Sequence, residues 1–125
     1  YTWFIMAYDP LLADRIRCFF ADLHVEFEDK KMMGGLCFMI DGKMCCGIHI
    51  DKNSDQSLLM ARLGSEACEQ ALDSPNVMPM NFTGRPMKGF IFIEEIGLRD
   101  DSNLHAWLQK CLDFNPLAKA SKKRK

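Results

Sequence analysis

A two-residue Asp41-Gly42 step between two apolar runs limits the fold of this chain more than any other feature. The runs cover residues 36–40 and 44–50. Asp-Gly favours a type I′ turn, because both residues tolerate a positive φ. The pattern therefore predicts a β-hairpin, around which the rest of the domain has to be built.

A two-residue loop also predicts the register of this hairpin. Counting back from the turn places Phe38 opposite Cys45 and Cys37 opposite Cys46. Because side chains alternate along a strand, Cys45 and Cys46 should point to opposite faces. Both faces of the hairpin are then largely apolar, unlike those of an antiparallel sheet with one face in water. We expect helices to cover one face, and a second copy of the chain or the chain's own loops to cover the other.

The remaining chain alternates between helical and extended patterns. Apolar residues recur at helical spacing over residues 10–23, over 65–72, and from Asp101 or Ser102 to near Pro116. Strand patterns occur at residues 25–32, 36–40, 44–50, 58–63 and 89–94, with a further short one near 80–82. Gly34-Gly35 indicates a turn or a close backbone approach. This order predicts an α+β domain of about five strands, flanked by one N-terminal and one C-terminal helix.

Composition narrows the class of protein. A chain of 125 residues with 48% hydrophobic and 26% charged residues is typical of a single soluble globular domain. Residues 119–125 hold five basic side chains and no acid, so the rest is acidic and unsuited to general nucleic-acid binding. There is no long apolar span and no signal-peptide pattern at the start. We therefore expect the six cysteines to be free thiols in the cytoplasm.

Three motifs together carry a family resemblance: KKMMGGLCFMIDGKMCCG, MARLG and NFTGRPMKGF. This combination resembles the N-terminal domain of the TfoX/Sxy competence regulators, over residues 6–117. The resemblance implies an antiparallel sheet with flanking helices and a bacterial regulatory domain without catalytic activity. Full-length regulators carry a second, C-terminal domain. This sequence shows no pattern for such a domain, so we expect a stand-alone member of the family. Residues 1–5 would be a natural extension or a cloning remnant, and 118–125 a flexible basic tail.

A glycine-rich basic segment is the first candidate binding site. Thr83, Gly84, Arg85 and Lys88 precede a strand, and Arg62 on another strand could join them. Glycine lets the backbone approach a ligand, and arginine offers a fork for carboxylate or phosphate. These residues predict a small anion site, although the segment is no Walker loop. The alternative is structural, with the arginine bound to loop carbonyls or an acid and the glycines serving turns.

The cysteines give a second candidate. Direct opposition would place Cys37 and Cys46 within disulfide reach, so they are a hypothetical redox pair, or else two reduced core residues. Cys45 and His49 share a face but lie about 13 Å apart along a strand, too far to share one zinc ion. We expect neither a metal nor a cofactor. No nucleophile motif such as G-x-S-x-G occurs, so no catalytic residues are predicted.

Taken together, these features favour a non-enzymatic regulatory or interaction domain that forms a homodimer through its second apolar face and binds a protein partner. The alternative is a protein that binds a small anionic ligand through Arg62, Arg85 and Lys88. Direct binding of nucleic acid is a third possibility. The family name and the basic tail suggest it, and the acidic body argues against it.

Overall fold

The computed structural model describes residues 8–32, 34–82 and 85–118, with side chains omitted for 81–87. The helices are α1 (Pro10–Asp22), α2 (Ser65–Ala71) and α3 (Asp101–Phe114), with 3-10 turns η1 (Glu95–Leu98) and η2 (Asn115–Leu117). The strands are β1 (Glu28–Met32), β2 (Gly35–Ile40), β3 (Lys43–Ile50), β4 (Ser57–Arg62), β5 (Val77–Phe82) and β6 (Arg85–Ile93). None of the described helices combines the length and the apolar character needed to cross a bilayer.

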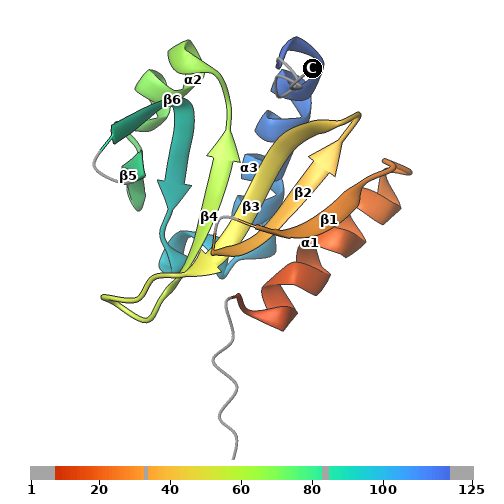
Figure 1. Ribbon diagram of the computed structural model, residues 1–125, viewed down its shortest axis with the longest axis horizontal. Coiled ribbons are helices and arrows are strands. Elements are labelled where there is room, and N and C mark those ends of the chain that lie inside the picture. The colour runs from red at the N-terminus through yellow and green to blue at the C-terminus, as the bar shows by residue number, and fades with distance from the viewer. Residues whose placement is uncertain (1–7, 33, 83–84, 119–125) are drawn as a thin grey trace, which may run out of the picture.

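All strands belong to one antiparallel sheet in the order β1-β2-β3-β4-β6-β5 (Figure 1). The predicted α+β class is confirmed, but the sheet has six strands where about five were expected. The additional strand is β5, whose Pro79 weakens its strand pattern. Proline is tolerated there because β5 is an edge strand, where a missing backbone N–H can face away from the sheet.

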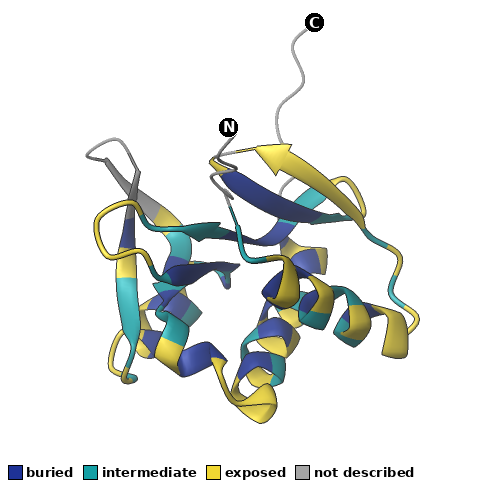
Figure 2. Cartoon of the chain, turned by 90° about the horizontal axis from the view of Figure 1, so that it is seen from below, coloured by how far each residue is buried: buried dark blue, intermediate teal, exposed yellow. Residues whose placement is uncertain are grey.

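The helices lie together on one side of the strands (Figure 2). α1 begins as its sequence predicts, since the Asp9 carboxylate accepts a hydrogen bond from the Leu11 N–H at 2.9 Å and Pro10 occupies the first turn. The main core lies between the helices and the sheet. Its largest fully buried side chains include Phe20 of α1, Phe38 of β2 and Leu108 of α3.

The central hairpin turns at Asp41-Gly42 as predicted, with φ of 58° and 74°. Its predicted register is wrong beyond Met39, because the pairing shifts between Phe38 and Met39. One extra residue of β3 is accommodated there, so Phe38 lies opposite Cys46. Such a bulge breaks the strict alternation of side chains along β3.

Candidate functional site

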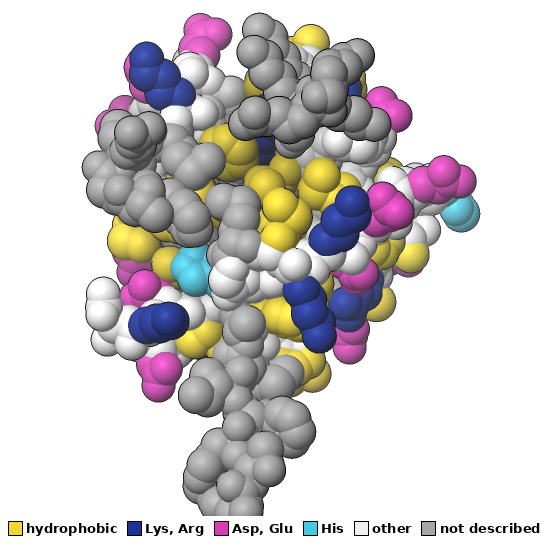
Figure 3. Space-filling model, viewed as in Figure 1, with side chains coloured by type: hydrophobic (Ala, Val, Ile, Leu, Met, Phe, Trp, Pro, Cys, Tyr) yellow, Lys and Arg dark blue, Asp and Glu magenta, His cyan; other side chains and the backbone are white. Residues whose placement is uncertain are grey.

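The sheet has an open face, defined here as the side away from the helices. A small apolar cluster lies on it, separate from the main core. Its centre is buried, and half-buried side chains pack around that centre. The buried members are Cys37, Met60 and Met80, and the half-buried members are Met44, Phe90 and Phe92. Figure 3 shows hydrophobic side chains gathered in the middle of this face, with charged side chains toward the flanks.

A glycine lets the centre of the open face close up. Gly47 of β3 lies between Cys37 of β2 and Met60 of β4. A Cβ atom at Gly47 would lie 3.1 Å from the Met60 terminal methyl and 3.2 Å from the Cys37 sulfur. The side chains of the two neighbouring strands therefore fill the space above β3. The result is a closely packed apolar cluster with a hollow of only about 10 Å³.

Two polar side chains stand against aromatic rings of this surface. The His49 ring lies 5.3 Å from the Phe92 ring, and burial lowers the pKa of His49, with Asp51 acting weakly in the opposite direction. The Arg62 guanidinium lies 5.4 Å from the centre of the Phe90 ring. It also donates a hydrogen bond to a backbone carbonyl of β3 at 3.3 Å. The open face thus combines an apolar centre with a cation–π contact.

The structure describes the side chains of only two of the predicted anion-binding residues, Arg62 and Lys88. Arg62 makes the contacts just described, and Lys88 is exposed beside a pocket of about 270 Å³ between α2 and the β5–β6 hairpin. Thr83 and Gly84 lie outside the described residues. Arg85 belongs to β6, but its side chain also lies outside the description. The anion site therefore stays a prediction.

The predicted direct opposition of Cys37 and Cys46 is wrong. Because of the bulge, Cys37 lies opposite Gly47 and Cys46 opposite Phe38. Cys37 belongs to the cluster on the open face, whereas Cys46 belongs to the core under the helices. The sheet backbone separates these two faces, so the pair is not directly opposed and its geometry no longer favours a disulfide.

The bulge instead brings Cys46 together with two other thiols. Cys45 and Cys46 both lie in the helix-side core, where Cys45 shares hydrogen bonds with Cys46 and with Cys111 of α3. Those bonds, and more weakly the charge of Arg62, lower the pKa of Cys45 against the opposing effect of burial. The same bonds and burial raise the pKa values of the other two. Cys45 is therefore the cluster's most acidic thiol, yet only 1% of its surface is exposed.

The sequence contains no signal for this thiol cluster, because alternation cannot locate a bulge in a strand that is apolar on both faces. In the described part of the chain, no three His, Cys, Asp or Glu side chains are placed to share a metal ion. The cluster fits the packing role that free cysteines commonly have in protein cores.

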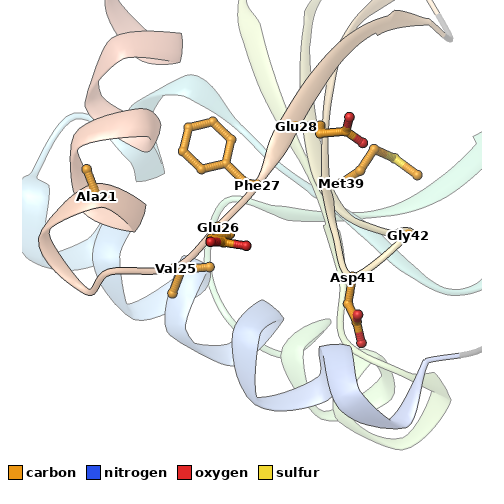
Figure 4. A pocket seen from close by; sticks show the side chains of 8 residues that line it. All are labelled: Ala21, Val25, Glu26, Phe27, Glu28, Met39, Asp41 and Gly42. Atoms are coloured by element: carbon orange, nitrogen blue, oxygen red, sulfur yellow. The ribbon is translucent and has the colours of Figure 1, made fainter.

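A wider pocket lies between the end of α1 and the central hairpin (Figure 4). Its volume is about 530 Å³, and it is open to solvent. Its lining combines apolar side chains with three carboxylates: Ala21, Val25, Phe27, Met39, Glu26, Glu28 and Asp41, together with Gly42. The carboxylates would repel an anion, so this pocket does not serve the ligand class that the sequence predicts.

The comparison with protein-family models gave one match, described as the TfoX N-terminal domain, over residues 19–115. That range contains all six strands, α2, α3 and the last four residues of α1. Neither a curated protein nor a solved structure was found to match the chain.

Proposed function

Because the chain belongs to the TfoX N-terminal domain family, we propose that it is a non-enzymatic regulatory domain of the bacterial cytoplasm that binds another protein through the open face of its sheet. The observation that carries this proposal is the group of half-buried apolar side chains there, Met44, Phe90 and Phe92. Contiguous apolar surface on a protein commonly marks an interaction site.

The shape of the open face favours a protein partner over a small molecule. Small-molecule pockets usually enclose roughly 300–1,000 Å³. The hollow on this face measures about 10 Å³, room for about one water molecule. The side chains around this hollow also have the composition of a protein–protein interface. Aromatic residues, methionine and arginine are enriched at such interfaces, and all three kinds occur on the open face. A partner that presents its own apolar side chains fits this surface best.

The test compares a half-buried apolar residue of the open face with an exposed apolar residue elsewhere. Phe92→Ser removes an aromatic ring from the open face, and Ile96→Ser changes an exposed residue of η1 as the control. Each variant and the parent protein would be used to capture proteins from a lysate of the source bacterium. Partners held by the parent and by Ile96→Ser but lost with Phe92→Ser would support the proposal. Equal capture by both variants, with melting curves confirming the fold, would refute it.

We also propose that the domain is a homodimer, as the sequence predicts.

A second candidate function is the binding of a small anion. The exposed Lys88, which lines the pocket of about 270 Å³ between α2 and the β5–β6 hairpin, favours this function. A thermal shift with phosphate or citrate that disappears in Arg85→Ala would support this function. The absence of any shift with either compound would count against it.

A further inference from the structure

The two edges of the sheet are built differently. β5 contains Pro79, and its pairing with β6 is irregular between Pro79 and Asn81. Both features hinder the addition of a further strand. β1 contains neither a proline nor a bulge, and it pairs with β2 in regular register from Glu28 to Met32. Among the described residues β2 is its only neighbouring strand, so β1 offers a regular edge.

β1 is also exposed along its whole length, and is drawn entirely in yellow in Figure 2. Its sequence is Glu-Asp-Lys-Lys-Met. Glu28 and Lys30 lie on the open face, since Lys30 pairs with Cys37. Asp29 and Lys31 lie on the helix side, where Asp29 reaches Arg17 of α1. Each face of the strand therefore carries an acid, followed two residues later by a base.

Most of these charges lack an ion-pair partner within the described chain. Glu28, Lys30 and Lys31 make no salt bridge to another described residue. Asp29 is held by Arg17 at 2.7 Å, which fixes β1 against α1. The edge is thus held by its pairing with β2 and by one ion pair to α1, and it presents three further charges to an approaching strand.

We propose that a second copy of the chain pairs antiparallel with β1, around a twofold axis that passes beside Asp29 perpendicular to the sheet. Glu28 of each copy then lies opposite Lys30 of the other, on the open face. The two central Asp29 carboxylates are each offset by an Arg17. A parallel copy in register would place like charges opposite one another, which is unfavourable. Charges on an edge strand usually prevent indiscriminate pairing, and this order selects an antiparallel copy.

This inference rests on the homodimer of the proposed function and locates its interface. The two sheets become one continuous sheet, and the open faces of both copies lie on the same side of it. The sequence predicts that the second copy covers the apolar face. Pairing at β1 instead leaves that face of each copy available to the protein partner.

The experiment measures solution mass by light scattering, and the dimer dissociation constant by sedimentation, over a range of concentrations. We expect a dimer whose dissociation constant rises at least tenfold in Glu28→Lys and in Lys30→Glu. The double charge swap should restore dimerisation, because it recreates both opposite-charge pairs. Lys52→Glu, at an exposed loop position, is the control and should dimerise normally.

Any of three results would overturn the inference: a parent protein that stays monomeric, single variants that dimerise like the control, or a double swap that fails to recover. Phe92→Ser separates this failure from failure of the proposed function. If Phe92→Ser breaks the dimer while Lys30→Glu does not, the second copy sits on the open face and the β1 interface is wrong. If Lys30→Glu is monomeric but still captures the partner, the β1 interface and the open-face function both stand.

Discussion

Replacement of Gly35 by alanine is the sharpest test of how the central strands are packed. Gly35 begins β2, next to the end of β3. A Cβ atom there would overlap the Ile48 carbonyl oxygen and would lie 2.7 Å from the His49 Cβ. Both neighbours belong to the body of β3, and one is a backbone atom. Neither can yield by a simple change of rotamer.

The magnitude follows from the movement that the methyl group requires. β2 and β3 must separate locally by about 1.5 Å to restore an ordinary contact. We expect this to weaken about two ladder hydrogen bonds, at about 1 kcal/mol each. Overpacking strain adds about 1–3 kcal/mol. The expected loss in the free energy of unfolding is therefore about 3–5 kcal/mol, a large part of the stability of a typical domain.

The adjacent glycine supplies the matched control. Gly34 has a φ of 76°, but a Cβ there would have no neighbour within 4 Å. Gly34→Ala should therefore cost only the left-handed backbone penalty of about 1–2 kcal/mol. Urea unfolding of both variants measures the two losses. If Gly35→Ala is as stable as Gly34→Ala, β2 and β3 do not approach as closely as the structure has them.

Three further predictions concern pH, thiol reactivity and helix packing. Burial lowers the folded-state pKa of His49 below that of the unfolded chain, so the free energy of unfolding should fall as the pH drops from 7.5 through about 6.5. His49→Gln should flatten that fall in urea titrations, and an unchanged slope would contradict it. In native protein, Ellman's reagent should modify one thiol quickly, the exposed Cys18, while Cys37 should stay protected because burial raises its pKa to about 11. Loss of the fast phase in Cys18→Ser confirms the assignment, and a second fast thiol in the parent would refute it. Arg15→Lys should lose about 1 kcal/mol in urea unfolding, because a lysine cannot keep both the 2.7 Å bond to the Leu98 carbonyl and the fork on the Asp101 carboxylate. Unchanged stability would show that this link between α1 and α3 contributes little.

The candidate site shows how far sequence reasoning extends on this chain. Two-sided apolar strands predict a sheet whose second face needs a cover, and the structure indeed carries a separate apolar cluster on that face. The members of the cluster could not be predicted, because one extra residue in β3 exchanges the faces of the side chains beyond it. Cys46 moves to the helix side for this reason, and Gly47 takes its place opposite Cys37.

The edge that we assign to a second copy shows the same limit. The charge order of residues 28–31 can be read directly from the sequence. That these residues form an edge, and that Pro79 blocks the opposite edge, depends on the strand order. Strand order follows from non-local pairing, which no local pattern specifies.

Features that depend on a few neighbouring residues can be predicted from the sequence alone. Asp41-Gly42 specifies the turn, because these residues accept positive φ. Asp9 and Pro10 specify the start of α1, because they satisfy or avoid unpaired N–H groups. The bulge at Cys45, the edge position of β5 and the identity of the strand that Gly35 approaches follow instead from tertiary packing. These features depend on packing between segments that are distant in the sequence. Local preferences cannot select them, because the strands are apolar on both faces and either face could point to the core.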